Sequence, residues 1–298
     1  MLLLPALARL HYDAGVSERI WRCRDHPFPL GERTLVMGVV NVTPDSFSDG
    51  GLFADTEDAV AHAARLTDEG ADIVDIGGES TRPGADPVSI DEELRRVIPV
   101  IEGLRVARPT VAVSVDTRHG LVANEAVAAG AAIVNDVSGG HDPVMLRVVR
   151  DSDVGLVLMH MQGDPRTMQA DPAYDDVVAD VHEYLRERVE TAVFAGISAD
   201  RLCVDPGIGF GKALEHNLAL LRAIDRLADL DAAVMVGASR KRFIGALTGV
   251  DDVSARLEGS LAAAVLAAAH GADVVRVHDV AETVRALQVA DAIVRGGA

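Results

Sequence analysis

The chain has 298 residues, of which 49% are hydrophobic and 25% are charged, and its formal net charge is −18. This length and composition are typical of one globular α/β barrel, which takes about 250 residues. The acidic charge argues against nonspecific binding of nucleic acids or anionic membranes, but it does not exclude a local cationic pocket for a small substrate.

The N-terminal residues and the cysteines indicate where in the cell the protein is found. The first ten residues are apolar only briefly and have no basic segment ahead of them, so we expect no signal peptide and no membrane span. The two cysteines, Cys23 and Cys203, lack metal-type spacing and indicate reduced thiols. We therefore expect a cytoplasmic enzyme.

Short apolar runs that are typical of buried strands alternate along the chain with longer amphipathic segments. We predict residues 1–30 to be an N-terminal extension or barrel cap, and residues 31–298 to form one domain. The predicted strands cover residues 34–40, 71–77, 111–116, 131–136, 154–160, 201–205, 232–239 and 272–279.

The segments between the strands carry helix signals. Acidic starts and glycine ends mark predicted helices over residues 55–70, 90–105, 174–196 and 257–271, with a kink or break expected at Pro99. Eight strands alternating with helices predict a (βα)8 TIM barrel. The competing fold, a doubly wound open sheet, would usually carry a glycine fingerprint after its first strand, and this sequence has none there.

All eight predicted strands end in potential ligand groups, which is where barrel enzymes carry their chemistry. Asp116, Asn135 and Asp205 end the third, fourth and sixth strands. Two carboxylates and an amide suit a flat heterocycle with several N–H donors and a carbonyl. A divalent metal is the alternative use of paired aspartates, although the neutral Asn135 between them weakens it.

A second group of strand-end residues is cationic. Arg82, Arg276 and His278 accompany Asn41, and arginine forks suit phosphate oxygens. The eighth and first strands are neighbours in a closed barrel, so Arg276, His278 and Asn41 should lie together. A diphosphate with Mg²⁺ would fit there, with Asn41 as a direct or near ligand, because Mg²⁺ takes few protein ligands.

The lysines are unusual because there are only two among 28 basic residues, and both fall in strand-end loops. A lysine is a compact, tunable charge that arginine does not replace. This placement favours a functional role for Lys241 strongly and for Lys212 only moderately. The loop GIGFGK, which ends at Lys212, departs from a Walker A loop because Ala213 follows the lysine. His160 is left ambiguous between lining the barrel mouth and packing.

Successive motifs along residues 34–280 resemble those of the dihydropteroate synthase family. They read NVTPDSFSDGG, DIGGESTRPGA, SVDT, VNDVSGG, LMHMQGDPRTMQ, DPGIGFGK, GASRKRFIG and RVHDV, in the family's order. The resemblance implies a pterin-binding (βα)8 barrel and a homodimer. It also implies condensation of 6-hydroxymethyl-7,8-dihydropterin diphosphate with p-aminobenzoate, giving 7,8-dihydropteroate and pyrophosphate for folate biosynthesis.

The resemblance assigns residues to three subsites. For the pterin it implies Asp116, Asn135, Met159, Asp205, Lys241 and Arg276; for the diphosphate, Asn41, Arg82, Arg276 and His278; for p-aminobenzoate, Thr81, Arg82, Pro83, Phe210 and Ser239. Mg²⁺ is the implied cofactor, with Asn41 as its protein ligand. The residues expected to carry catalysis are Asn41, Arg82, Asp116, Lys241, Arg276 and His278.

The family mechanism resembles an SN1 process, in which charge stabilisation and positioning do the work and no protein nucleophile is needed. The loops that begin at Asn41 and Thr81 would close over the mouth and complete the second substrate's site. Two alternatives stay open. One is the pterin domain of a corrinoid-dependent methyltransferase, and the other is a pterin-binding paralogue without synthase turnover.

Overall fold

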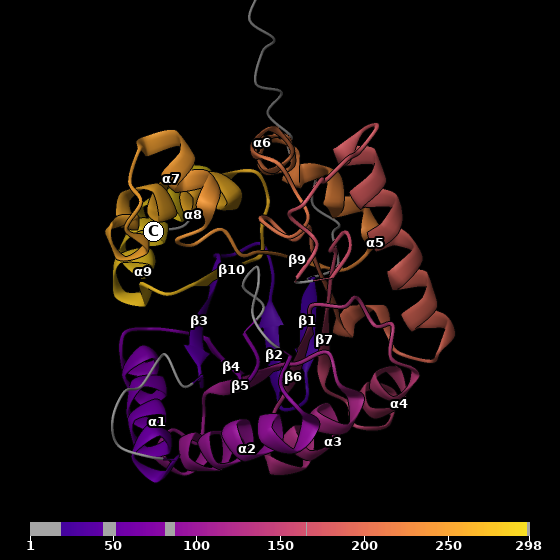
Figure 1. Cartoon of the computed structure of the whole chain (residues 1–298), viewed down its shortest axis with the longest axis vertical. Helices are drawn as coiled ribbons and strands as arrows, with labels where there is room; N and C mark the ends of the chain where they lie inside the picture. Colours follow the sequence, from indigo (N-terminus) through magenta and orange to yellow (C-terminus); the bar gives the residue numbers. More distant parts are fainter. Residues whose placement is uncertain (1–18, 44–51, 81–86, 165, 297–298) are drawn as a thin grey trace, which may run out of the picture.

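The computed structural model describes residues 19–43, 52–80, 87–164 and 166–296, and in them eight parallel strands close into a barrel (Figure 1). In barrel order they are β3 Leu35–Asn41, β4 Ile73–Gly77, β5 Ala112–Asp116, β6 Ile133–Asp136, β7 Gly155–Met159, β8 Leu202–Asp205, β9 Ala233–Val236 and β10 Val274–Val277. Pairing of β10 with β3 completes the ring. The eight predicted strands and the TIM-barrel fold class are confirmed.

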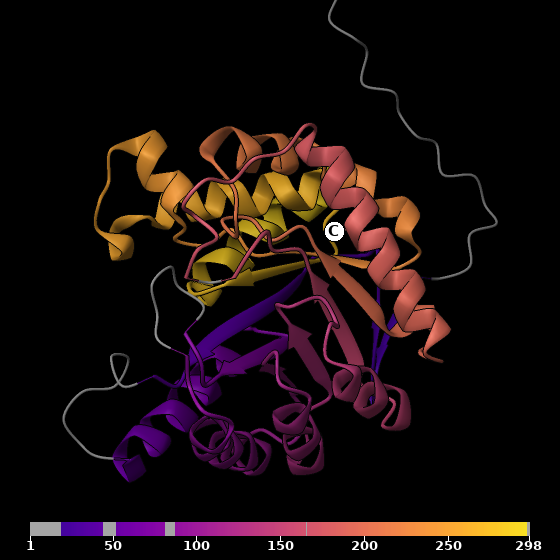
Figure 2. The ribbon, with the colours of Figure 1, turned by 45° about the vertical axis from the view of Figure 1, so that its right-hand side comes forward.

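Helices surround the strands on the outside of the barrel (Figures 1 and 2). They are α1 Leu52–Asp68, α2 Ile90–Ala107, α3 Gly120–Ala129, α4 Pro143–Asp151, α5 Val177–Phe194, α6 Leu214–Arg222, α7 Arg242–Thr248, α8 Leu257–Ala269 and α9 Val280–Val294, with 3₁₀ turns at Ala199–Arg201, Ile224–Leu230 and Val253–Ala255. The four predicted helices are confirmed. Of the kink or break expected at Pro99, the break is wrong, because α2 runs through that residue, and the kink stays a prediction.

The turns from helix to strand depend on glycine. Gly70, Gly130, Gly196 and Gly271 follow helices at φ values of 102°, 113°, 96° and 99°. These angles lie in a region that L side chains rarely adopt, so the glycines end the helices and redirect the chain into the next strand. Gly70, Gly196 and Gly271 are also the ends of three helices predicted from the sequence.

The N-terminal end of the barrel is closed by a hairpin of β1 Ile20–Cys23 and β2 His26–Pro29. Trp21 and Cys23 pack in one apolar cluster with inward-facing strand residues. The Trp21 indole Nε1 donates to the Arg201 carbonyl oxygen at 3.1 Å, so the ring's polar atom is satisfied although the ring is buried. Residues 1–18 lie outside the described residues, so the assignment of residues 1–30 to one extension stays a prediction.

The barrel interior changes character along its axis. Because strand side chains alternate between the two faces, residues two apart share the inner face. Ile73, Ile133, Cys203 and Val274 form part of the apolar cluster at the N-terminal end. Two residues further along the same strands stand Asp75, Asn135, Asp205 and Arg276. The polar end of the barrel therefore begins inside the strands, one layer below the loops.

None of the helices in the described part of the chain combines the length and the apolar composition that a membrane crossing requires.

Candidate active site

Arg276 lies at the centre of the polar layer and joins two carboxylates from other strands. Its Nε donates to Asp75 Oδ2 at 2.6 Å, and its Nη2 donates to Asp116 Oδ2 at 2.7 Å. The side chain of Asp75 is fully buried and that of Asp116 is 11% exposed. The guanidinium fork of Arg276 therefore spans the barrel mouth from β10 to β4 and β5.

Asp75 was missed by the strand-end argument because it lies within β4, two residues before the strand ends. Its Oδ2 also accepts from Asn135 Nδ2 at 3.1 Å, so it orients two predicted site residues at once. Its Oδ1 has no hydrogen-bond partner among the described residues. The two-residue alternation that places Ile73 inside the barrel also places Asp75 inside, and this signal would have found it.

Asp205, Lys241 and Arg276 converge around Gly237, which directly follows β9. A Cβ atom on Gly237 would lie 3.7 Å from Arg276 Cβ, 3.8 Å from Asp205 Oδ2 and 3.8 Å from Lys241 Nζ. Glycine therefore leaves a small open volume bounded by one carboxylate and two cations. Asp205 also accepts a hydrogen bond from Gly207 N at 2.7 Å, which fixes its carboxylate.

Burial changes the proton affinities of these groups. It raises the pKa of Asp116 to about 7, although the Arg276 guanidinium acts in the opposite direction. It also raises the pKa of Asp205, with Lys241 offsetting part of the effect. Burial lowers the pKa of Lys241 to about 8, against the pull of the Asp205 carboxylate. Perturbed groups gathered at a barrel mouth are typical of functional sites.

Arg276 behaves differently from the other buried groups. Burial alone would lower its pKa, but the carboxylates of Asp75 and Asp116 outweigh that effect and raise it. The arginine therefore stays charged at every physiological pH. It supplies a permanent positive charge at a point that three carboxylates approach.

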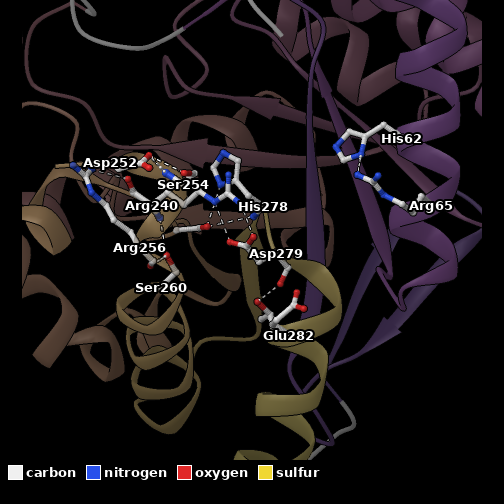
Figure 3. Close-up of polar contacts among 12 residues, drawn as sticks. His62, Arg65, Arg240, Asp252, Ser254, Arg256, Ser260, His278, Asp279 and Glu282 are labelled. Atoms are coloured by element: carbon white, nitrogen blue, oxygen red, sulfur yellow. Dashed lines mark hydrogen bonds and ion pairs between the residues drawn. The ribbon is translucent and has the colours of Figure 1, made fainter. Parts of the chain in front are cut away.

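Asn41 and His278 lie at the rim, at the ends of β3 and β10. His278 contacts Ser239 Oγ through its backbone N at 3.3 Å and its Nδ1 at 3.0 Å, which brings a third strand end into the group. A cavity of about 790 Å³ opens beside Asn41 and His278, with His62, Arg65 and Glu282 among its lining residues (Figure 3). The cavity extends from the barrel rim to the space between α1 and the start of α9.

The segment that carries Ser239 and Lys241 is braced from outside the barrel. Arg240 adopts φ of 59°, and its Nε donates to Asp279 Oδ2 at 3.0 Å (Figure 3). Its backbone N donates to Ser260 Oγ at 2.9 Å. These contacts hold both the side chain and the backbone of Arg240 and so fix the segment that carries its neighbours Ser239 and Lys241.

The loop after β8 brings Phe210 to the same region. Lys241 Nζ lies 4.5 Å from the centroid of the Phe210 ring, a cation–π contact, and donates to the Ile208 carbonyl oxygen. Met159, at the end of β7, pairs in register with Asp205 and is 3% exposed. His160 does not join the polar cluster around Arg276. It is buried between Lys212 and Tyr184.

The structure thus brings together most of the predicted site residues. Thr81, Arg82 and Pro83 lie outside the described residues, as does most of the loop that follows Asn41. In the described part of the chain, no three His, Cys, Asp or Glu side chains gather so that they could hold a metal.

Comparison with known proteins agrees with the family resemblance of the sequence motifs. The model of the pterin binding enzyme family matches residues 37–278. Dihydropteroate synthase of Escherichia coli (strain K12) is 49% identical over 257 residues, which are 86% of this chain and 90% of that protein. Dihydropteroate synthase of Neisseria meningitidis serogroup C is 45% identical over 282 residues, which are 93% and 99% of the two chains.

Solved structures show the same likeness. Xanthomonas albilineans dihydropteroate synthase with 4-aminobenzoic acid superposes with a TM-score of 0.87 at 52% identity, over 93% of this chain and 98% of that one. The same enzyme in complex with 7,8-dihydropteroate gives a TM-score of 0.80 at 51% identity, over 88% and 94% of the chains.

Proposed function

The chain belongs to the pterin-binding enzyme family as a dihydropteroate synthase, and from this premise we propose which of its residues bind each substrate and how they promote the reaction. The enzyme joins 6-hydroxymethyl-7,8-dihydropterin diphosphate to p-aminobenzoate, and 7,8-dihydropteroate and pyrophosphate are released. The observation that carries the assignment of residues is the convergence of Asp205, Lys241 and Arg276 on the open volume at Gly237.

The pterin ring occupies the polar layer of the barrel. The carboxylates of Asp116 and Asp205 accept from ring N–H groups, Asn135 offers both a donor and an acceptor, and Lys241 donates to the ring carbonyl. Met159 supplies an apolar contact at the same level. A ligand that satisfies all these buried groups binds selectively, because an analogue would leave some of them unpaired.

Arg276 changes partners when the pterin binds. In the structure its Nη2 donates to the Asp116 carboxylate that the ring needs. Its bond from Nε to Asp75 can persist, because Asp75 lies deeper in the barrel than Asp116, which is in register with Gly77. Asp75 therefore acts as a pivot that keeps the guanidinium in the mouth. The guanidinium, once released from Asp116, then stacks its plane on the face of the pterin ring or faces the diphosphate.

The diphosphate lies at the rim beside Asn41, His278 and Arg276, with Arg82 from outside the described residues. The donor set fits Mg²⁺, because Mg²⁺ usually keeps several waters and takes one or two protein oxygens together with substrate phosphates. Asn41 offers such an oxygen. When bound, Mg²⁺ would neutralise charge on the departing diphosphate. His278, held by Ser239, donates to the same oxygens.

p-Aminobenzoate lies outside the pterin, against Phe210 and Ser239. The Phe210 ring offers an apolar face, and Ser239 offers a hydroxyl to the carboxylate. Thr81, Arg82 and Pro83 would complete this subsite from the loop after β4. The arrangement leaves the amine of p-aminobenzoate facing the methylene carbon that carries the diphosphate.

The reaction follows an SN1-like course, in which the C–O bond to the diphosphate breaks before the aniline nitrogen attacks. Positive charge then develops on the pterin methylene, and the carboxylates of Asp116 and Asp205 stabilise it. The new C–N bond then forms, and the nitrogen releases one proton to solvent or to the departing pyrophosphate. The proposal includes no covalent bond to the protein. Its catalytic contributions are the fixed charges and the alignment of the two substrates.

The direct test is an incubation with Mg²⁺, the dihydropterin diphosphate and p-aminobenzoate, read by mass spectrometry for dihydropteroate. A matched incubation omits p-aminobenzoate. Product in the full mixture alone supports the assignment. Tight binding of the pterin diphosphate without product would instead favour a paralogue without turnover. Transfer of a methyl group from a methylated pterin to a corrinoid would favour the methyltransferase domain.

We also propose a homodimer and a cytoplasmic location. Consecutive helices α7, α8 and α9 gather on one side of the barrel (Figure 1) and expose Leu247, Leu266 and Ile293, at 57%, 57% and 78%. An apolar face formed by neighbouring helices is typical of an interface between copies. The two thiols are unpaired and buried, which suits a reducing compartment.

A further inference from the structure

We propose that Lys212 is a positioning residue of this enzyme: its buried ammonium ties the loop after β8 to the end of β7 and thereby places Phe210 and the Ile208 carbonyl against Lys241. This inference rests on the proposed function, because Phe210 and Lys241 are assigned there to the two substrates. Lys212 contacts the Phe210 backbone and neither of the proposed substrates, and is therefore not a catalytic residue.

The contacts of Lys212 match a charged ammonium group. Its Nζ lies 2.9 Å from the Phe210 carbonyl oxygen, 2.9 Å from His160 Nδ1 and 3.4 Å from the His160 carbonyl oxygen. A lysine ammonium has three donors and no acceptor, so the three protons meet three acceptors. The residue is 3% exposed, which leaves no place for water to satisfy these groups instead.

His160 has to be a neutral acceptor for this arrangement to hold. Burial and the neighbouring Lys212 charge lower the pKa of His160 to about 3, so the ring is neutral at physiological pH. The Nε2 tautomer then leaves Nδ1 free to accept. The ring is also packed edge-on against Tyr184, with centroids 4.8 Å apart, which fixes its orientation.

The loop from Pro206 to Lys212 is held in one conformation by its glycines and hydrogen bonds. Gly207 has φ of 66°, and a Cβ there would collide with the His160 carbonyl oxygen. Gly209 N donates to Asn217 Oδ1 at 2.6 Å, and the Tyr174 hydroxyl donates to the Gly211 carbonyl at 2.7 Å. These bonds secure alternate peptide groups of the loop, and Lys212 secures the carbonyl of Phe210 between them.

The position of this loop affects the proposed substrate sites in two ways. The Ile208 carbonyl accepts from Lys241 Nζ, and the Phe210 ring lies under the same ammonium at 4.5 Å. Loss of the Lys212 amino group would leave the Phe210 carbonyl and His160 buried without a donor, and the loop would shift to solvate them. Phe210 would then move, and p-aminobenzoate would lose its apolar contact.

The charge on Lys212 also depends on pH near neutrality. Burial lowers the pKa of Lys212 to about 7; the Asp205 carboxylate acts against this, and the Lys241 ammonium adds to it. His160, Asp205 and Lys241 are the titratable groups that face it from β7, β8 and the loop after β9. Deprotonation leaves two N–H donors for three acceptors. The hydrogen bonding of Lys212 to the loop therefore weakens as pH rises through neutrality.

The test is steady-state kinetics of Lys212→Met, which keeps the length of the side chain and removes its charge. We expect the KM for p-aminobenzoate to rise about tenfold, while the Kd for the dihydropterin diphosphate changes less than about threefold. The KM of the unaltered enzyme should rise between pH 6.5 and 8, and that of the variant should not follow this titration.

His160 provides a second pair of variants if Lys212→Met does not fold. His160→Asn keeps an acceptor oxygen near the Nδ1 position, whereas His160→Leu removes it. The proposal expects the Asn variant to retain a KM close to the original and the Leu variant to show the raised KM. Equal KM values in the two variants, or a folded Lys212→Met with unchanged KM and pH profile, would overturn it. No turnover in the unaltered chain would instead remove the proposed function and this inference with it.

Discussion

Arg276 and Asp75 form an ion pair inside the barrel, with Arg276 Nε 2.6 Å from Asp75 Oδ2 and the carboxylate fully buried. The two residues are 201 positions apart and come from β10 and β4, which are separated in the ring by β3. Asp75 also accepts from Asn135, so one buried carboxylate orients a proposed diphosphate ligand and a proposed pterin ligand.

The first prediction concerns Asp75→Asn. The amide would weaken the charge-assisted bond to Arg276 and place an N–H₂ group near donors that need an acceptor. We expect kcat/KM to fall about 10- to 100-fold, which corresponds to about 1.5–3 kcal/mol for a buried bond to a charged group. Steady-state kinetics with saturating p-aminobenzoate would measure it.

A matched control is Asp72→Asn, at the residue that directly precedes β4. Asp72 bonds to Arg33 and to Val36 N, far from the mouth. It should alter thermal stability without altering kcat/KM. Equal activity of the Asp75 and Asp72 variants would mean that the pivot has no part in the reaction.

Much of the site could be predicted from the sequence, because ligand groups that end consecutive parallel strands must meet at one mouth. Asn41, Asp116, Asn135 and Asp205 followed from that rule. Asp75 escaped it, because the rule looks at strand ends and Asp75 needs the two-residue alternation instead. The bond between Lys212 and His160 joins residues 52 apart, and its geometry depends on how two loops stack. No local pattern encodes such a contact.

The second prediction is that Lys241→Arg loses most of its activity. Lys241 Nζ is enclosed by the Ile208 carbonyl, the Phe210 ring and the neighbourhood of Asp205. A longer, planar guanidinium would displace the Phe210 ring or enter the open volume at Gly237, although the positive charge is kept. We expect kcat/KM to fall at least about 100-fold in the dihydropteroate assay. Near-normal turnover would show that charge alone suffices there.

The third prediction concerns pH. Burial raises the pKa of Asp116 to about 7, so the carboxyl is mostly protonated at pH 6 and mostly ionised at pH 8. A ring N–H needs the ionised form as acceptor, so pterin affinity should fall about tenfold as pH falls from 8 to 6. Calorimetric titration with 6-hydroxymethylpterin avoids the ionisation of the diphosphate.

Asp116→Asn isolates this effect, because its side chain does not titrate while Lys241 and Asp205 remain. The variant should bind more weakly at pH 8 and lose most of the slope between pH 6 and 8. A slope that persists unchanged in the variant would assign the titration to another group.

The fourth prediction concerns Mg²⁺. If Asn41 supplies the protein oxygen, Asn41→Leu should raise the Mg²⁺ concentration for half-maximal activity about tenfold or more. Binding of 6-hydroxymethylpterin should be unchanged, because that ligand lacks the diphosphate. A Mg²⁺ titration of turnover on both proteins would decide it. An unchanged Mg²⁺ requirement would mean that the substrate and other residues bind the metal, and that Asn41 does not.

The fifth prediction concerns the apolar face on α7, α8 and α9. Leu266 is 57% exposed on α8, and Val289 and Ile293 are 62% and 78% exposed on α9. Leu266→Glu would place a charge where two copies meet, and burying an unpaired carboxylate costs several kcal/mol. Light scattering coupled to size exclusion should therefore show a dimer for the unaltered chain and a monomer for the variant.

Val106→Glu is the matched control, because Val106 is 86% exposed on α2, away from this face. It should leave the mass unchanged. The strand-end residues of the proposed site all come from one chain, so a folded Leu266→Glu monomer should still bind 6-hydroxymethylpterin. A monomeric unaltered chain, or dissociation by both substitutions alike, would contradict an interface on this face.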